Sequence, residues 1–307
     1  MRQFLGIEIG GTKLQLVAGD ERANILRRWR FDVDAGRAGA GIRAQIESAL
    51  PEIFSAHPIA MTGVGYGGPV DWRTGKICCS HQVEGWADFP LGDWLRERTG
   101  QPIIIDNDAN VGALGEARRG AGQGCNPVFY VTLGSGVGGG LVVGEKIFHG
   151  AKPGESEIGH VRLDQTGTIV EKRCSGWAVD KKICAAASQN PASILARLIA
   201  GMDRGQARTL EPALRARCPL AQSVLSEVAG DLAFALSHVT HLVHPELIVL
   251  GGGLSLVGEP LRSAVQNALR GFVMDAFAPG PRVALAALRE DAVPIGALLL
   301  AQSAASA

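Results

Sequence analysis

The sequence predicts an α/β protein with two related halves, and two features of the chain support this prediction. First, an apolar strand enters a glycine-rich turn and leaves as a second strand at residues 4–18, and a similar unit recurs at residues 128–146. Second, residues 101–120 (QPIIIDNDANVGALGEARRG) have the pattern of a buried strand that ends in polar residues and continues as a helix. A strand, a polar tip and a helix in succession are typical of α/β folds.

The remaining elements follow in chain order. Residues 60–72 (AMTGVGYGGPVDW) predict a strand that runs into a Gly-Pro loop. A loop-rich stretch after residue 146 leads to helices up to about residue 240, because apolar residues recur there at helical spacing. The strand ELIVL (246–250) then runs into GGGLS and a helix at about 257–271, and residues 292–305 predict a last apolar helix.

Composition and charge narrow the classes of function. The chain has 307 residues, 46% of them apolar, which is long enough for two domains with buried cores. Its 30 basic and 30 acidic residues balance, so the net charge creates no field that gathers nucleic acid or an anionic membrane. Glu8 interrupts the first apolar stretch, which does not suit a secretory signal, and no apolar run reaches the roughly 18 residues of a spanning helix. We therefore expect a cytoplasmic protein that binds neither nucleic acid nor a membrane.

Three glycine-rich turns at strand ends indicate phosphate binding, because N–H groups exposed in a turn form a concavity for anions that a Cβ would obstruct. The alternative for each turn is a tight hairpin without a ligand. The chain has no P-loop motif. Residues 134–139 (GSGVGG) match the dinucleotide pattern G-x-G-x-x-G, but a strand follows where that pattern requires a helix, which argues against a dehydrogenase.

Seven short motifs, in order along nearly the whole chain, resemble those of the ROK family of bacterial sugar kinases and repressors. They are IEIGGTK, GVGYGGPVD, IDNDAN, TLGSGVGGG, GESEIGH, EKRCSG and PELIVLGGGLS. The resemblance implies the α/β, two-domain actin-like ATPase (ribonuclease H-like) fold, with mixed sheets and an interdomain cleft for sugar and ATP. We expect residues 1–116 plus 297–307 to form the N-terminal domain and residues 117–296 to form the C-terminal domain.

The same resemblance implies an ATP-dependent sugar kinase that uses Mg²⁺. Both glycine-rich hairpins are expected to meet the ATP phosphates, and the GGGLS loop is expected to meet the adenosine. The expected ATP-binding residues are Gly10, Gly11, Thr12, Lys13, Gly134, Ser135, Gly136, Gly138, Gly252 and Gly253. For Lys13, a solvated position in the turn stays open as an alternative to a phosphate contact.

Asp108 is the expected catalytic residue. A carboxylate at the tip of a buried strand can accept the proton of a sugar hydroxyl while that oxygen attacks the γ-phosphorus in line, and the family's general base matches this position. The alternative is that Asp108 caps the helix that begins near Ala109. Asn107 is expected to bind sugar hydroxyls, whereas Asp106, one residue earlier in the strand, is expected to face away.

The expected sugar site also draws residues from elsewhere in the chain. Ring hydroxyls are bound well by carboxylates and imidazoles, which form charge-assisted hydrogen bonds. By resemblance, Glu157 and His160 match the family's E-x-G-H motif, and Glu171 matches its glutamate before Ser-Gly. The alternative for Glu171 is a surface glutamate. Gly68, in the Gly-Pro loop, is expected to let the backbone approach the sugar.

In its metal ligands the chain departs from its relatives. Many family members hold a structural zinc with the E-x-G-H histidine and three cysteines, but Arg162, Asp164 and Ile169 occupy the cysteine positions here. We therefore expect no zinc. Glu8 stands where the family more often has aspartate, and we expect it to position Mg²⁺ through water, because Mg²⁺ keeps several waters and takes few direct carboxylates.

We expect a homodimer, as in the family, that transfers the γ-phosphoryl group of ATP to a hydroxyl of a hexose or N-acetylhexosamine. One alternative is a sugar-binding or sensor protein of the same fold without a DNA-binding domain. Its catalytic activity would be weak because of the loss of zinc and the change at Glu8. The other alternative is a sugar-responsive repressor. Its helix-turn-helix would precede the first hairpin, which begins here at residue 4, so we expect none.

Overall fold

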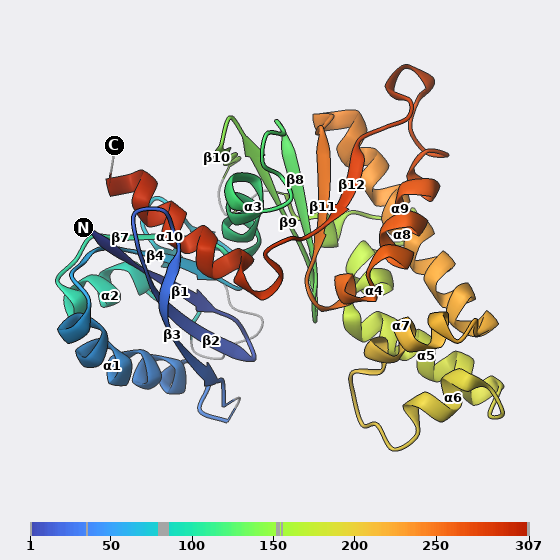
Figure 1. The fold of residues 1–307 in the computed structure, drawn as a ribbon, viewed down its shortest axis with the longest axis horizontal. Coiled ribbons are helices and arrows are strands. Elements are labelled where there is room, and N and C mark those ends of the chain that lie inside the picture. The colour runs from blue at the N-terminus through green and yellow to red at the C-terminus, as the bar shows by residue number, and fades with distance from the viewer. Residues whose placement is uncertain (1, 35, 79–85, 152–153, 155, 306–307) are drawn as a thin grey trace. The chain divides into compact units, whose positions relative to one another are not determined.

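The computed structural model describes residues 2–34, 36–78, 86–151, 154 and 156–305 (Figure 1). The chain divides into two compact units. Unit 1 consists of Met1–Gly124, Gly140–Glu155 and Glu290–Ala307, and unit 2 consists of Cys125–Gly139 and Ser156–Arg289. The structure contains two five-stranded sheets, each with parallel and antiparallel neighbours, so the predicted α/β class with mixed sheets is confirmed.

The first sheet, in unit 1, contains the first glycine-rich hairpin and has the strand order β3-β2-β1-β4-β7. Its strands are β1 (Gln3–Ile9), β2 (Lys13–Gly19), β3 (Ile25–Asp32), β4 (Ile59–Tyr66) and β7 (Ile103–Asn107). The first three strands pair antiparallel in succession, whereas β4 lies parallel to both β1 and β7. The carboxyl ends of β1, β4 and β7 therefore lie at the same edge of the sheet.

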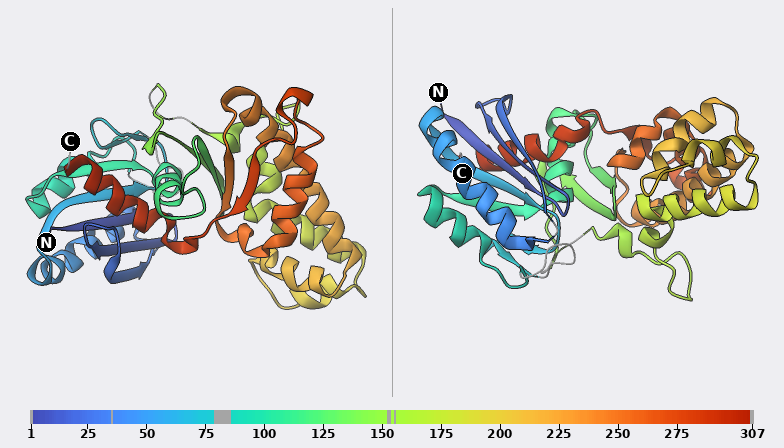
Figure 2. Two further views of the ribbon diagram at one scale, coloured as in Figure 1. Left: turned by 45° about the horizontal axis from the view of Figure 1, so that its top comes forward. Right: turned by 90° about the horizontal axis from the view of Figure 1, so that it is seen from below.

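Helices cover both faces of this sheet (Figures 1 and 2). They are α1 (Ala38–Ala56), α2 (Leu91–Thr99), α3 (Asp108–Arg119) and α10 (Ala292–Ala305). The first two pack against the buried side chains of Leu5, Ile7 and Ile9, and the other two pack against Phe4 and Val17. Successive side chains of a strand point to opposite faces, so an apolar run of this kind is buried on both sides.

Small residues let α10 lie directly on the sheet. Gly63 of β4 has no room for a side chain, because a Cβ there would overlap the carbonyl oxygen of Ala297 in α10. Gly296 of α10 approaches the backbone of Val111 in α3 in the same way. The two-residue strands β5 (Val70–Asp71) and β6 (Lys76–Ile77) pair in the loop that follows β4.

The second sheet contains the second glycine-rich hairpin and has the strand order β10-β9-β8-β11-β12. Its strands are β8 (Val128–Leu133), β9 (Val137–Val143), β10 (Lys146–Ile147), β11 (Leu247–Gly251) and β12 (Arg282–Leu285). β11 lies parallel to β8 and to β12, whereas β9 and β10 pair antiparallel. The division between the units falls within β9, after Gly139.

The helices of unit 2 are α4 (Val170–Cys174), α5 (Gly176–Gln189), α6 (Ile194–Ile199), α7 (Leu210–Arg215), α8 (Pro219–Val243) and α9 (Glu259–Leu269). α8 is the long helix that the sequence predicted before residue 240. Pro219 lies in its first turn, and the side chains of Val228, Leu232 and Leu236 form a buried stripe at helical spacing. The helix ends at Val243, and the next residue, His244, caps it with a left-handed backbone conformation.

The two units differ from the expected domains at three segments. Residues 117–124, 140–155 and 290–296 belong to unit 1, although the sequence placed them in the second domain. The reason is packing: α3 continues to Arg119, and both β10 and α10 pack against α3. These contacts join segments that are far apart along the chain, so no local pattern predicts them.

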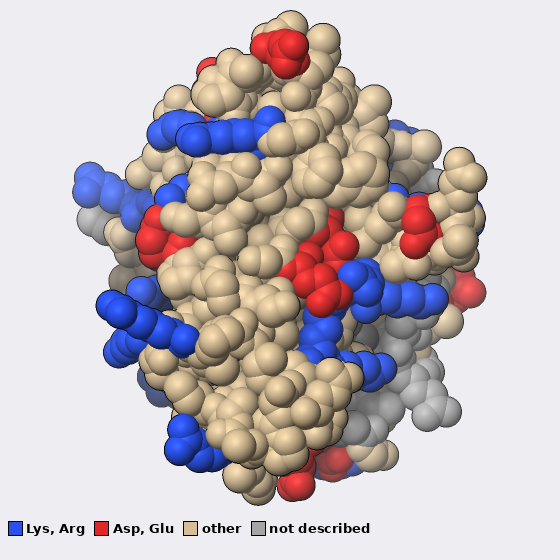
Figure 3. Space-filling view, turned by 90° about the vertical axis from the view of Figure 1, so that its right-hand side faces the viewer, with Lys and Arg blue, Asp and Glu red and all other residues tan. Residues whose placement is uncertain are grey.

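The face of the molecule drawn in Figure 3 is not strongly charged. On the face drawn in Figure 3, Lys and Arg side chains lie scattered among Asp and Glu side chains and a larger uncharged area, in keeping with a net formal charge of zero. Among the described residues, no helix combines the length and the apolar character that crossing a membrane requires.

Candidate active site

In unit 1, the residues expected to bind the acceptor sugar and the phosphates follow the ends of three parallel strands, at one edge of the sheet. Ile9, Tyr66 and Asn107 are the last residues of β1, β4 and β7, and they are partners in register. The glycine turn at residues 10–12, the loop at Gly67 and Gly68, and Asp108 follow these strand ends. Ligands of open α/β sheets bind at this carboxyl edge.

The three segments meet at Gly67. Its N–H donates to the carbonyl oxygen of Ile9 at 2.8 Å. A Cβ on Gly67 would lie 3.2 Å from that oxygen, 3.3 Å from Oδ2 of Asp108 and 3.5 Å from Cα of Gly10. The carboxylate expected to act as a base therefore lies next to the turn expected to bind phosphate, and the turn itself is closed by the hydrogen bond from Gly10 N–H to the carbonyl of Lys13 at 2.9 Å.

Asn107, rather than Asp108, caps helix α3. The side-chain oxygen of Asn107 accepts hydrogen bonds from the N–H groups of Ala109 (2.9 Å) and Asn110 (3.3 Å), so the alternative that assigned the cap to Asp108 is wrong. The Asn107 amide also donates to the carbonyl oxygen of Gly68 at 3.1 Å. A second hydrogen of that amide can still bind a ligand. Asp108 is the first residue of α3 and is half-buried.

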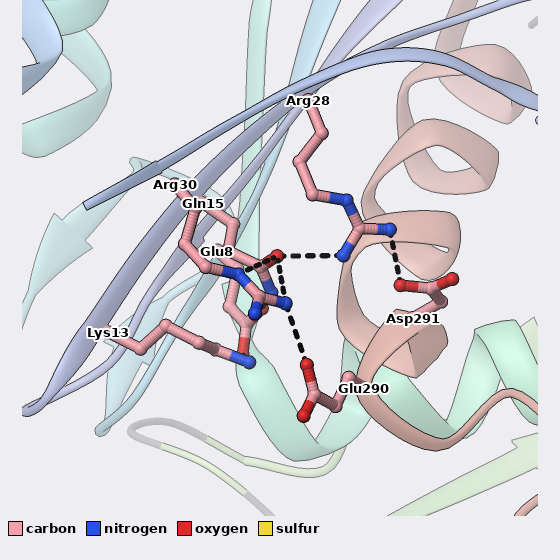
Figure 4. A network of polar contacts seen from close by, with 7 residues as sticks. All are labelled: Glu8, Lys13, Gln15, Arg28, Arg30, Glu290 and Asp291. Atoms are coloured by element: carbon pink, nitrogen blue, oxygen red, sulfur yellow. Dashed lines mark hydrogen bonds and ion pairs between the residues drawn. The ribbon is translucent and has the colours of Figure 1, made fainter. Parts of the chain in front are cut away.

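Glu8 lies in a network of polar side chains beside the first hairpin (Figure 4). Its carboxylate contacts the Lys13 ammonium at 3.1 Å and accepts a hydrogen bond from the Gln15 amide at 2.6 Å. Burial raises the pKa of Glu8 above its ordinary value, and Lys13 opposes this rise. Lys13 therefore forms an ion pair with Glu8 and is not simply a solvated lysine.

The same network reaches the residues just before α10. Gln15 is fully buried, and its side-chain oxygen accepts hydrogen bonds from Arg28 (2.9 Å) and Arg30 (3.2 Å). These two arginines form ion pairs with Asp291 and Glu290, respectively (Figure 4). The strands of the hairpin and the start of the C-terminal helix are thus linked through one buried amide.

The Glu8 carboxylate offers oxygen atoms, which are the hard ligands that Mg²⁺ prefers. Both of its oxygens already have a donor, one from Lys13 and one from Gln15. A carboxylate accepts more than two hydrogen bonds, so a metal-bound water can still be held without breaking these contacts. This geometry favours contact through water over direct coordination.

In unit 2, the second glycine turn is held by two other segments. Gly134 N–H donates to the carbonyl of Gly136 at 3.0 Å and closes the turn, and the carbonyl of Gly134 accepts from Gly176 N–H at 2.7 Å. Gly252 has a positive φ of 77°, and a Cβ there would lie 2.5 Å from the nitrogen of Leu133 at the end of β8. The expected adenosine loop therefore packs directly beside the expected phosphate turn.

The Glu171 side chain contacts this turn, so it is not a surface glutamate without contacts. Its Oε2 accepts a hydrogen bond from the N–H of Val137 at 3.0 Å, and a Cβ on Gly136 would lie 2.5 Å from the same oxygen. A residue that the resemblance assigns to the sugar is thus in contact with the turn assigned to ATP. The sequence offered no signal for this contact, because the two residues are 34 positions apart.

Glu157 and His160 lie at the two ends of a single short turn. The 3-10 helix η1 (Ile158–His160) brings them together, with the His160 N–H donating to the Glu157 carbonyl at 3.0 Å. Gly159 between them packs so closely on the backbone of Val137 that a side chain would not fit. Both Glu157 and His160 are exposed. The structure therefore gathers the three expected sugar residues of unit 2 around the start of β9.

The expected zinc-cysteine positions lie in a hydrogen-bonded turn. Arg162 and Ile169 form a β-bridge, and the Asp164 carboxylate accepts from Thr166 Oγ1 (2.7 Å) and Thr168 N–H (3.1 Å). Among the residues that the structure describes, no group of three or more His, Cys, Asp or Glu side chains is placed to hold a metal. Burial raises the pKa of the nearby Cys174 thiol to about 12.

Comparison with known proteins agrees with these motifs. Residues 4–304 match the sequence model of the ROK family. The chain is 32% identical to a glucokinase of Halalkalibacterium halodurans, across 96% of this chain and 93% of the relative. It resembles the crystal structure of a ROK family glucokinase from Streptomyces griseus in complex with glucose and AMPPNP (TM-score 0.86, 29% identity, 98% of this chain and 99% of that one). It also resembles a ROK hexokinase from Thermus thermophilus (TM-score 0.80, 26% identity, 99% of each chain).

Proposed function

The chain belongs to the ROK family, and from this premise we propose that it is an ATP-dependent sugar kinase. It transfers the γ-phosphoryl group of ATP to a hydroxyl of a hexose or N-acetylhexosamine. The observation that carries the proposal is the meeting of Asp108, Gly67 and Gly10 at the carboxyl edge of the first sheet. The relatives named glucokinase make glucose the first acceptor to test.

In the proposed reaction, Asp108 acts as the general base. Its carboxylate accepts the proton of the sugar hydroxyl while the hydroxyl oxygen forms a bond to the γ-phosphorus, and the bond from that phosphorus to the bridging oxygen breaks to release ADP. Asn107 supports this assignment, because its side chain, and not that of Asp108, caps α3. Glu8 would hold Mg²⁺ through water, and the metal would neutralise charge on the phosphates.

Two short turns are proposed to bind the phosphates. The N–H groups of Gly10 and Gly134 close their own turns, so we assign the phosphate contacts to the tips, at Thr12 in the first hairpin and Ser135 and Gly136 in the second. Gly252 and Gly253 are assigned to the adenosine, which is supported by the packing of Gly252 against the second hairpin.

The residues that we propose for sugar contacts are Gly68, Asn107, Glu157, His160 and Glu171. Glu171 has a second contact in this proposal, because the same carboxylate binds the phosphate turn at Val137. A homodimer, a cytoplasmic location and the absence of zinc stay predictions.

A catalytically weak sugar-binding protein of the same fold is the second candidate. One observation favours it: the Glu8 carboxylate is already held by Lys13 and Gln15. If this arrangement prevents Mg²⁺ from binding, sugar would bind without being phosphorylated. Calorimetric titration of a sugar that binds but is not turned over would support this candidate over the kinase.

The decisive experiment measures ADP release with a panel of acceptors. Glucose, mannose, galactose, fructose and the N-acetylhexosamines are each supplied with Mg²⁺ and ATP, and the sugar phosphate is identified by mass spectrometry. An Asp108→Asn preparation, purified in the same way, reports any contaminating kinase. If no sugar raises ADP release above the sugar-free rate, the proposed function is refuted.

A further inference from the structure

His149 makes a short contact with a buried carboxylate that directly precedes the proposed catalytic tip. The ring Nε2 of His149 lies 2.6 Å from Oδ2 of Asp106, and the two side chains are 20% and 4% exposed. A carboxylate can only accept, so the ring donates from Nε2. Hydrogen bonds to an ionised carboxylate are shorter and stronger than those between neutral groups. Nothing in the sequence motifs singled out His149, which follows β10 along the chain.

Asp106 transmits this contact to the catalytic tip. Its other oxygen, Oδ1, accepts hydrogen bonds from the N–H of Asn107 (2.8 Å) and from the side-chain amide of Asn110 (2.9 Å). Asp106 therefore joins the end of β7, the first turn of α3 and His149. Asp106, which was expected to face away from the sugar, is the buried anchor of the tip that carries Asn107 and Asp108.

Trp72 completes a circuit of contacts around the proposed acceptor residues. Its ring stacks on the His149 ring, with centroids 4.1 Å apart and an interplanar angle of 18°. Trp72 lies in the same loop as Gly68, and the carbonyl oxygen of Gly68 accepts from the Asn107 amide at 3.1 Å. These contacts connect Gly68, Asn107, Asp106, the His149 ring and Trp72 in turn. The chain between Gly68 and Trp72 closes the ring of contacts.

We propose that His149 is a positioning residue for phosphoryl transfer: its hydrogen bond to Asp106 holds the Asn107–Asp108 tip in place for the acceptor sugar, and its stack on Trp72 orients the ring that makes this bond. This inference rests on the proposed kinase function. Its physical basis is that a general base works only at hydrogen-bond distance from the proton it accepts. A displacement of about 1 Å can cost about 10²-fold in rate, so a residue that does not touch the sugar can still control turnover.

The test compares two substitutions at His149. His149→Phe keeps an aromatic ring for Trp72 but removes the donor to Asp106, whereas His149→Gln keeps an N–H donor at a similar distance from the backbone and loses the ring. We expect His149→Phe to lower kcat with the best sugar by about 10- to 100-fold, with the KM for ATP changed by less than about twofold. We expect His149→Gln to restore kcat to within about fivefold of wild type.

His57 provides a matched control in the same unit. Its ring Nδ1 lies 2.7 Å from the side-chain oxygen of Gln3, and its ring packs edge-on against Trp29. Gln3 is at the start of β1, so this pair lies at the opposite end of the sheet from the catalytic tip. His57→Phe therefore removes a similar hydrogen bond and is expected to lower the melting temperature without changing kcat, measured well below that temperature.

Each outcome bears on the proposal. A His149→Phe enzyme with wild-type kcat, or a His149→Gln enzyme as slow as His149→Phe, overturns it, because the hydrogen bond to Asp106 would then not control turnover. If His149→Phe does not fold, Asp106→Asn keeps the shape of the anchor without its charge, and a kcat unchanged from wild type again overturns the proposal. A wild-type protein that phosphorylates no sugar overturns the proposed function and this inference together, whereas an active wild type with a fully active His149→Phe overturns this inference alone.

Discussion

Replacing Lys13 should destabilise the folded protein, because Lys13 is the positively charged partner of the buried Glu8 carboxylate. In Lys13→Met, the Glu8 carboxylate loses the cation 3.1 Å away and keeps one neutral donor, the Gln15 amide. Breaking a buried ion pair by removing one partner typically costs about 3–5 kcal/mol. Because the Glu8 side chain is 13% exposed and Arg30 still contributes a favourable charge, we expect about 2 kcal/mol at pH 8.

The pH dependence follows from the direction of the Glu8 pKa. Burial raises this pKa in the folded protein above its value in the unfolded chain, so the folded state keeps the proton to higher pH. The stability that this proton provides is present at low pH and is lost as the pH rises through the raised pKa. Lys13→Met should raise the pKa further, so the variant should lose most stability at pH 8 and approach wild type as Glu8 becomes protonated.

Urea unfolding followed by tryptophan fluorescence measures the loss of stability in unit 1, which contains Glu8. Four of the five tryptophans lie in unit 1, together with Glu8; the tryptophans are Trp29, Trp72, Trp86, Trp94 and Trp177. The double variant Glu8→Gln/Lys13→Met has no buried charge at the pair and should be more stable than Lys13→Met alone by about 1 kcal/mol. Lys13→Arg, which keeps the positive charge, is the control.

Two results would refute this reasoning. One is a Lys13→Met protein that unfolds at the wild-type urea concentration at pH 8. The other is a double variant that is less stable than the single variant at that pH, since neutralising Glu8 would then have removed a favourable group instead of a costly one.

Three further predictions concern the site and the packing around it. Asp108→Asn should lower kcat by about 10²–10⁴-fold with little change in sugar affinity, and turnover within about threefold of wild type would remove Asp108 from the role of base. Glu171→Leu cannot accept the Val137 N–H and should raise the KM for ATP by about tenfold, whereas Glu171→Gln, which keeps an accepting oxygen, should have a smaller effect; equal values for the two variants would contradict this. Gly63→Ala should destabilise the protein by about 1–3 kcal/mol because the added methyl overlaps the backbone of α10, while Gly230→Ala in α8, where a Cβ meets no atom within 4 Å, should stabilise it by about 0.5–1 kcal/mol; thermal unfolding of the pair tests both signs.

A prediction about metal content tests the turn at Asp164. Elemental analysis of the purified protein should find less than about 0.1 zinc per chain, because hydrogen bonds from Thr166 and Thr168 hold this turn without a thiolate cage. A chelator should stop turnover by removing Mg²⁺ and leave the melting temperature unchanged. Stoichiometric zinc would show that the zinc positions were assigned to the wrong residues.

Local patterns determined much of this protein in advance. The two glycine-rich hairpins, the strand β7 with its polar tip and the long helix α8 were all predicted, because alternation, helical spacing and turn residues act over a few neighbouring positions. The ROK family was likewise predicted, because its motifs are short runs in a definite order, and the comparisons confirm it.

Only the tertiary structure decided which side chains meet. The contacts of His149 with Asp106 and of Glu171 with Val137 join residues 43 and 34 positions apart, and Arg28 reaches Asp291 across 263. The choice of Asn107 over Asp108 as the helix cap also depended on the backbone at the end of β7, since either residue type suits that role. Sequence periodicity shows which face of a single helix or strand is apolar and which is polar. Which faces come together depends on strand order and on the close packing of α10 and β10 against α3, and these are properties of the folded chain as a whole.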